Sequence, residues 1–311
     1  MTIVAPKVAT TEGGRPSPPR RKKSLLKSRG ALIAYAFILP YVVFFLTFRI
    51  IPALYGIILS FGKYGLAGTF DFIGLKNYER LFNDSLFWKS LSVTALYAAI
   101  AIPLTVAISL AMAQLCNRLL RGMSFYRSIY FLPVVTSAVL SGIIFIWIFS
   151  HEGPLNSLLG LLGININSSW LQSNLLVLPA LALVSAWMNF GYNMLILLAG
   201  MLAIPQEYYE AAQVDGAPAW RRFISITLPL LKPSLFFVLV LETIKSFQAF
   251  DTIYVMTGGG PVRESYTLTY MIFDQGFGYF DFGYASAAGV VLLVVTLVFS
   301  LIQRRLVGGT D

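Results

Sequence analysis

The feature that most constrains this chain is a series of six long apolar stretches, at about residues 31–60, 87–115, 128–149, 174–203, 234–256 and 284–303. A bilayer core about 30 Å thick is crossed by roughly 20 apolar residues in a helix, so each stretch is long enough to span a membrane. Only 12% of the 311 residues are charged, whereas soluble domains carry roughly 25%. The pattern therefore predicts an all-α integral membrane protein with six transmembrane helices.

The basic residues between these stretches indicate an orientation. Sixteen of the 23 Lys and Arg residues lie in the N-terminal segment, the second and fourth connections and the C-terminus, and five lie in the other connections. The positive-inside rule then predicts that both termini are cytoplasmic. We expect a disordered basic tail over residues 1–29, a transmembrane domain over 30–305 and a C-terminal tail over 306–311. Because the net charge of +9 is concentrated in the first tail, it does not indicate nucleic-acid binding.

The chain lacks the residues that most catalytic and metal sites need. It has one cysteine, Cys116, and one histidine, His151, which argues against a disulfide framework and a Cys- or His-rich metal site. No G-x-x-x-x-G-K-[ST] phosphate loop occurs, and the run Gly258 to Pro261 has no lysine to reach a phosphate. We therefore expect no enzyme activity, catalytic residue, metal or cofactor in this chain. A solvated or helix-capping role is the expectation for His151.

The fourth connection, residues 204–233, is too polar to span a membrane and lies on the predicted cytoplasmic side. Its first part, Gln206 to Val214, is free of Pro and Gly and favours a short helix. Asp215-Gly216 is a turn signal, and Pro218 suits the start of a second helix. We expect helix breaks at Pro229 and Pro233 before the chain returns to the bilayer. A short exposed helix with small residues on its surface favours close approach of a partner.

This connection carries a family signature. Glu210-Ala211-Ala212, three residues, Gly216, nine residues, Ile226, one residue and Leu228-Pro229 resemble the EAA signature of permease subunits of binding-protein-dependent ABC importers. In that family the signature marks a cytoplasmic coupling helix, placed here between the fourth and fifth spans, that sits in a groove of the ATPase subunit. The resemblance implies this role for Glu210, Ala211, Ala212, Asp215 and Gly216.

The resemblance covers most of residues 33–305 and is closest in pattern to the carbohydrate branch, which includes maltose, trehalose and glycerol-3-phosphate permeases. The matching segments are FIGLKNYERLF (72–82), FYRSIYFLP (125–133), GPLNSLLG (153–160), FDTIYVMTGGGP (250–261) and FGYASA (282–287). It implies a bacterial or archaeal cytoplasmic membrane, a second permease subunit that is a different chain, a dimer of ATP-binding subunits that uses ATP and Mg, and an extracytoplasmic solute-binding protein. The implied substrate is a sugar, moved by alternating access.

Polar residues inside the fourth and fifth stretches are the candidate substrate contacts, because ionisable groups in a membrane are costly and tend to be functional. Hydroxyl, amide and aromatic groups of this kind bind sugar hydroxyls and stack on sugar rings. The candidate residues are Ser185, Asn189, Tyr192, Asn193, Glu242, Lys245 and Ser246. Glu242, Ser246 and Ala249 are spaced to share one helix face, and Lys245 is spaced to pair with Glu242.

The resemblance to maltose-type permeases supports this set in part. Aligned through the EAA signature, the ligand-contacting positions of those permeases fall at Ser185, Asn189, Tyr192, Glu242, Ser246 and Ala249. Tyr192 keeps its residue type, whereas Asn189, Glu242 and Ala249 depart from the maltose pattern, which argues against maltose itself. A purely structural Glu242–Lys245 pair stays open as the alternative, and Asp251 fits a structural or gating role better than ligand binding.

Two other functions stay open. Glycerol-3-phosphate or a glycerophosphodiester is the alternative substrate, since a phosphate favours cationic groups such as Lys245, although the spans carry few others. In an ion-coupled secondary carrier, Asp251 or Glu242 would bind the coupling ion. A membrane enzyme or receptor is disfavoured because no catalytic cluster is present.

Overall fold

The computed structural model describes residues 29–66, 68–117, 122–164 and 168–307. The chain divides into two compact units, Met1–Ala53 and Leu54–Asp311. In the first unit, α1 (Arg29–Phe45) continues through a π-helical turn (Leu46–Ile50) into the start of α2 (Ile51–Leu59). The predicted basic tail lies outside the described residues except for Arg29, and so does the predicted C-terminal tail after Val307.

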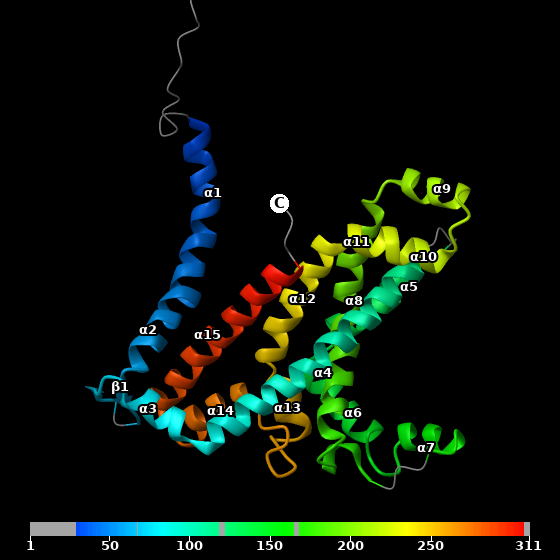
Figure 1. Cartoon of the computed structure of the whole chain (residues 1–311). Coiled ribbons are helices and arrows are strands. Elements are labelled where there is room, and N and C mark those ends of the chain that lie inside the picture. The colour runs from blue at the N-terminus through cyan, green and yellow to red at the C-terminus, as the bar shows by residue number, and fades with distance from the viewer. Residues whose placement is uncertain (1–28, 67, 118–121, 165–167, 308–311) are drawn as a thin grey trace, which may run out of the picture. The chain divides into compact units, whose positions relative to one another are not determined.

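The second unit is almost entirely helical (Figure 1). Its elements are β1 (Gly62–Tyr64), β2 (Phe70–Phe72), α3 (Lys76–Asn83), α4 (Ser85–Cys116), α5 (Met123–Phe131), a 3-10 turn (Leu132–Val135), α6 (Ala138–Ile148), α7 (Pro154–Leu161), a 3-10 turn (Trp170–Gln172), α8 (Val177–Leu202), α9 (Gln206–Val214), α10 (Ala219–Arg222), a π-helical turn (Phe223–Thr227), α11 (Leu228–Leu230), α12 (Lys232–Phe247), α13 (Asp251–Met256), α14 (Leu268–Phe273), a π-helical turn (Asp274–Gly278) and α15 (Phe282–Val307).

The helices account for the six apolar stretches. Among the described residues, four helical segments are long and apolar enough to cross a membrane: Tyr35–Leu59, Ser85–Cys116, Val177–Leu202 and Phe282–Leu306. Two bent helix pairs bring the number to six if each pair is one span. The prediction of an α-helical integral membrane fold is confirmed. The described part also holds one short antiparallel hairpin, β1–β2, so the fold is not strictly all-α.

The third and fifth stretches were expected to be continuous helices, and both are broken. The third divides into Met123–Val135 and Ala138–Ile148, which meet at 95°. Thr136 and Ser137 between them have extended backbones. In the fifth stretch α12 ends at Phe247 and α13 begins at Asp251. The predicted helix over 234–256 is therefore interrupted at residues 248–250, and its outer part is the separate helix α13.

The entry to the fifth stretch also differs from the prediction. We expected breaks at Pro229 and Pro233, but Pro229 lies inside the helical segment Ala219–Leu230, and Pro233 is in the first turn of α12. A proline is tolerated in the first turn of a helix because the N–H groups there have no intrahelical partner. The break falls at Leu231, where the two segments meet at 71°.

The core of the second unit is built on α4 and α8, which pack along each other. Tyr97 and Ala101 of α4 meet Leu181 and Val184 of α8 in one buried apolar cluster, which Ile253 of α13 also joins. Small residues such as Ala180, Ala182 and Ala186, all fully buried, allow the close helix approach that is typical of membrane bundles. The fourth span, predicted over 174–203, thereby becomes the central helix of the unit.

The second unit has two distinct ends (Figure 1). One end holds α9, α5 and the end of α15, and the other holds α3, α7, α13 and α14. The connections that were predicted to be cytoplasmic therefore gather at one end, as the positive-inside argument requires. Arg118 and Arg121, which contributed to that argument, lie outside the described residues.

Candidate functional site

The structure forms two candidate sites in the second unit, and the first is the α9 loop. The predicted helix over Gln206–Val214 has the same bounds as α9. Its first turn carries Glu207, which suits the positive end of the helix dipole. The loop is fastened to the following segment by a hydrogen bond of 2.9 Å between the hydroxyls of Tyr209 and Thr227.

Gly216 ends α9 in a Schellman motif. Its φ is +72°, a left-handed conformation that a glycine adopts without the steric cost that a Cβ brings. The Ala217 N–H donates to the Ala212 carbonyl at 2.9 Å, and the Gly216 N–H donates to the Gln213 carbonyl at 3.1 Å. The turn signal at Asp215-Gly216 is thus explained by a specific backbone requirement.

The predicted coupling residues lie on an open surface. Glu210, Ala211, Asp215 and Gly216 are exposed, and Ala212 is half-buried. Large apolar side chains beside them are exposed too: Tyr208 is 54%, Val214 is 89% and Trp220 is 66% exposed. Exposed large apolar side chains on such a loop favour a protein interaction surface.

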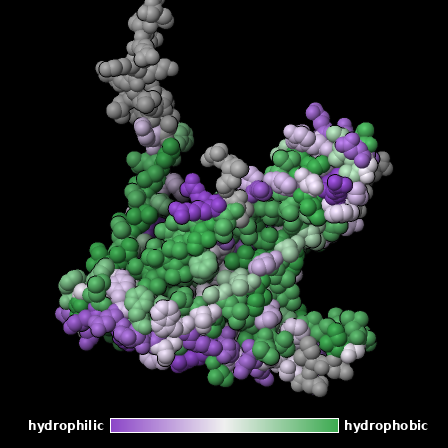
Figure 2. Space-filling view, viewed as in Figure 1, coloured by the Kyte–Doolittle hydropathy of each residue, from purple (hydrophilic) through white to green (hydrophobic). Residues whose placement is uncertain are grey.

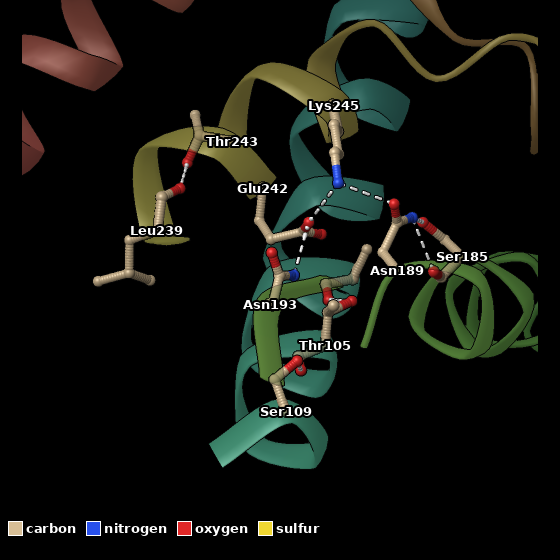
Figure 3. A network of polar contacts seen from close by, with 10 residues as sticks. Thr105, Ser109, Ser185, Asn189, Asn193, Leu239, Glu242, Thr243 and Lys245 are labelled. Carbon is tan, nitrogen blue, oxygen red and sulfur yellow. Dashed lines mark hydrogen bonds and ion pairs between the residues drawn. The ribbon is translucent and has the colours of Figure 1, made fainter. Parts of the chain in front are cut away.

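The second candidate site is a network of polar side chains between α8 and α12 (Figure 3). The Asn193 amide donates to Glu242 Oε1 at 2.8 Å. The Lys245 ammonium donates to Asn189 Oδ1 at 2.9 Å and to Glu242 Oε1 at 3.3 Å. The Asn189 amide in turn donates to the Ser185 carbonyl at 2.8 Å. Residues from the two predicted polar stripes therefore form one connected site.

The two charged side chains of this site differ in their exposure to solvent. The Glu242 side chain is 1% exposed, whereas the Lys245 side chain is 39% exposed. A buried carboxylate is costly unless a cation and hydrogen bonds compensate it, and Lys245 and Asn193 supply both. The partly exposed ammonium lies 5.3 Å from the centre of the Tyr192 ring, within reach of a cation–π contact.

Two buried polar atoms at the site have no partner within the described residues. They are Asn193 Oδ1 and Ser246 Oγ, and their residues are 0% and 3% exposed. Ser246 follows Glu242 by four residues, so both lie on one face of α12. An unpaired buried polar group costs roughly 1–3 kcal/mol, so these atoms favour a hydrogen-bonding ligand or water.

The remaining predicted residues lie apart from this network. Ala249 follows the end of α12 and does not share a helix face with Glu242, because the helix has already ended at Phe247. Asp251 is exposed at the start of α13. His151 is exposed beyond the end of α6.

Sequence reasoning missed the contribution of α4. Thr105 and Ser109 lie beside Asn193 in Figure 3, and both are fully buried. Their hydroxyls donate to backbone carbonyls one turn earlier, at 2.8 Å to Ala101 and 2.6 Å to Thr105. Two hydroxyl residues four apart in the apolar second half of this span were the signal that could have indicated this face.

Within the part of the chain that the structure describes, no group of three His, Cys, Asp or Glu side chains is arranged to hold a metal ion. The first candidate site is an exposed loop that carries apolar side chains, and the second is a network of hydrogen-bonding side chains between α8 and α12.

Comparison with known proteins shows which protein family the chain resembles. The profile of the family described as the binding-protein-dependent transport system inner membrane component matches residues 106–310. The chain is 39% identical over 285 residues to the probable ABC transporter permease protein YesP of Bacillus subtilis (strain 168), covering 90% of this chain and 92% of that protein. It is 36% identical to the arabinooligosaccharides transport system permease protein AraP of the same organism, with 88% of each chain covered.

A solved structure shares the fold. A chain in the crystal structure of a bacterial ABC transporter involved in the import of the acidic polysaccharide alginate superposes with a TM-score of 0.75, at 23% identity, over 88% of this chain and 96% of that chain. At this level of identity the likeness shows the fold alone.

Proposed function

This chain belongs to the family of binding-protein-dependent transport system inner membrane components, and from that premise we propose that it is the sugar-translocating permease subunit of an ATP-driven importer. It moves a di- or oligosaccharide inward across the cytoplasmic membrane by alternating access. Both termini are cytoplasmic. The chain itself is not an enzyme, because ATP and Mg are used by separate ATPase subunits.

The observation that carries the sugar assignment is the pair of unpaired buried atoms, Asn193 Oδ1 and Ser246 Oγ. Asn193 Oδ1 accepts a hydrogen bond, and a serine hydroxyl both donates and accepts. A sugar hydroxyl is complementary to both. Lys245 bonds to the same Glu242 oxygen as Asn193 does, and the Tyr192 ring lies 5.3 Å from its ammonium. The site therefore offers donors, acceptors and an aromatic surface, which is the combination that suits a saccharide. The name of the relative AraP supports a saccharide substrate.

The α9 loop is the proposed contact with the ATPase. The coupling surface consists of Glu210, Ala211, Ala212, Asp215 and Gly216. The exposed Tyr208 and Val214 supply apolar contact area for one subunit of the ATP-binding dimer. A second permease chain, different from this one, completes the channel. An extracytoplasmic solute-binding protein delivers the sugar at the opposite end.

The partly exposed ammonium of Lys245 favours a second candidate substrate, glycerol-3-phosphate or a glycerophosphodiester, because a phosphate binds cations strongly. Against it, Glu242 already neutralises Lys245 at 3.3 Å. A neutral sugar is therefore the better match to the net charge of this pair.

The experiment is transport and ATP hydrolysis by the reconstituted importer with its binding protein, tested with a panel of di- and oligosaccharides and glycerol phosphates. For a saccharide, Ser246→Ala should raise the half-maximal concentration about 2- to 10-fold, the loss expected for one hydrogen bond of roughly 0.5–1.5 kcal/mol. Ser90→Ala is the matched control, because Ser90 is also buried in a span but donates to the Leu86 carbonyl away from the site.

Three results would contradict the proposal. Stimulation by glycerol phosphates alone would transfer the assignment to the second candidate. If Ser246→Ala and Ser90→Ala changed the half-maximal concentration equally, the polar network would not be the substrate-binding site. Uptake that follows an ion gradient without any ATPase subunit would identify a secondary carrier instead.

A further inference from the structure

A pocket lies at the opposite end of the unit from α9, where the hairpin and α3 pack against the start of α15 (Figure 1). Its volume is about 290 Å³. Three basic side chains line it: Lys63 from β1, and Lys76 and Arg80 from α3. Lys76 and Arg80 are one helical turn apart, so they share a face of α3.

The walls of this pocket are fixed by buried contacts. The side-chain amide of Asn77, which is 6% exposed, donates to the carbonyls of Ser60 at 3.0 Å and Gly62 at 2.9 Å. Gly283 of α15 approaches the hairpin so closely that a Cβ there would overlap with the Gly62 carbonyl oxygen. These contacts join α3, the hairpin and α15, so the pocket is a built feature of the fold.

The charges that face the pocket do not cancel. Arg80 pairs with Asp281 at 2.7 Å, and its guanidinium lies 4.1 Å from the centre of the Tyr284 ring. Among the described side chains, neither Lys63 nor Lys76 forms an ion pair with a carboxylate. Asp71 stands opposite Lys63 in the hairpin register but does not line the pocket. Two ammonium groups are therefore left for an anion.

The position of the pocket indicates which anion. Lys63 follows the end of one candidate span, Leu59, by four residues, and Asp281 directly precedes α15. The pocket thus lies where spans leave the hydrocarbon core, which is the level of lipid headgroups. Exposed apolar side chains flank it: Leu66 is 75%, Phe72 is 75% and Leu75 is 67% exposed. Figure 2 shows hydrophilic surface over β1 and α3 next to the apolar surface of the helices.

We propose that this pocket binds the phosphodiester of an anionic phospholipid headgroup in the leaflet opposite α9. Lys63 and Lys76 provide the charge, and the side chain of Arg80 forms the wall of the pocket toward Asp281. The flanking apolar side chains lie in the acyl region beside the same lipid. This proposal does not depend on the identity of the transported solute.

The test measures how much lipid the intact importer retains. The importer is reconstituted in nanodiscs that contain either phosphatidylglycerol or only phosphatidylcholine and is then released from them. Bound lipid is counted by native mass spectrometry and by extraction. The variant is Lys63→Gln with Lys76→Gln. Its control is Lys89→Gln with Arg263→Gln, which removes two cations on the same predicted side but outside the pocket, where Lys89 pairs with Glu264.

We expect phosphatidylglycerol to be retained by the wild type and the control, and about 10- to 30-fold more weakly by the pocket variant, as loss of two basic groups near a lipid surface implies. Equal retention by all three proteins would overturn the proposal. Equal binding of phosphatidylcholine would also overturn it. Displacement of the lipid by millimolar glycerol phosphate would assign the pocket to a soluble phosphate. A loss of binding-protein affinity with unchanged lipid retention would make it a protein-docking site instead.

Discussion

Replacing Gly216 by alanine tests the proposed coupling role of the α9 loop more cleanly than any charged substitution. Gly216 holds φ at +72°, and a Cβ added there meets no heavy atom within 4 Å. The substitution therefore changes the backbone preference and creates no clash. Its whole effect falls on the turn that closes α9.

The size of the effect follows from the turn itself. An L-residue in the left-handed region costs about 1–2 kcal/mol. The two hydrogen bonds of the Schellman motif contribute roughly 0.5–1.5 kcal/mol each. Because the penalty is comparable to what holds the turn closed, the ratio of closed to frayed turn falls about 5- to 30-fold. We expect asparagine, which tolerates this conformation, to be milder, and valine to be more severe.

The assay is the ATPase activity of the reconstituted importer with and without its loaded binding protein, together with solute uptake. We expect Gly216→Ala to lower the stimulated rate about 2- to 10-fold with unchanged assembly of the complex. Gly163→Ala is the matched control, because Gly163 ends α7 with φ at +78° and the same two-bond motif, at the other end of the unit.

Two results would refute this reasoning. If Gly163→Ala reduces stimulation as much as Gly216→Ala does, the loss reflects general destabilisation. If the series alanine, asparagine and valine at Gly216 leaves stimulation unchanged, the shape of the α9 terminus does not matter for coupling.

Three further predictions concern other parts of the second unit. Gly283→Ala should displace the hairpin, because the added Cβ would overlap with the Gly62 carbonyl oxygen, a backbone atom that can shift only together with the hairpin. We expect the free energy of unfolding to fall by about 1–3 kcal/mol, seen as faster hydrogen exchange of β1, and unchanged exchange would contradict the close contact. Glu242→Gln leaves the ammonium of Lys245 without a carboxylate and should lower sugar-stimulated ATPase about tenfold, with partial rescue by Glu242→Asp; an unaffected rate would favour a purely structural pair. Burial, and then the hydrogen bond to Asp274, raise the pKa of Tyr266 above its usual value of 10.0, so the folded state keeps a proton that the unfolded state loses. Stability should therefore fall as pH rises above about 10, and Tyr266→Phe should flatten this dependence in alkaline thermal melts, whereas an equally steep loss in the variant would place its cause elsewhere.

The sequence was sufficient to locate the helices that begin and end at strong signals. The bounds of α9 follow from a Pro- and Gly-free run closed by Asp215-Gly216, and α4 and α8 lie within three residues of the predicted stretches. The breaks inside the third and fifth stretches could not be predicted in this way. Thr136, Ser137 and the segment after Phe247 are only mildly unfavourable in a helix, so hydropathy continues through them while the backbone turns.

At the candidate site, too, some contacts could be predicted from the sequence and others could not. The one-turn spacing of Glu242, Lys245 and Ser246 on α12 was readable, because it depends on one helix alone. The bond from Lys245 to Asn189 was not, because it depends on how α12 is rotated against α8. Thr105 and Ser109 were missed for the same reason, since which face of α4 meets α8 is decided by tertiary packing of small and large side chains.

The connections of α9 give a physical link between the two candidate sites. It follows α8 after only three residues, and α8 carries Asn189 and Asn193. The hydroxyl bond from Tyr209 to Thr227 ties α9 to the segment that leads into α12, which carries Glu242 and Lys245. Asn193 lies nine residues from the end of α8, about 14 Å along a helix. A displacement of α9 therefore acts on the two helices whose contact forms the polar network, and a shift of one against the other breaks or remakes the bonds from Asn193 and Lys245. The network is therefore the element on which the proposed coupling and the proposed substrate binding would both act.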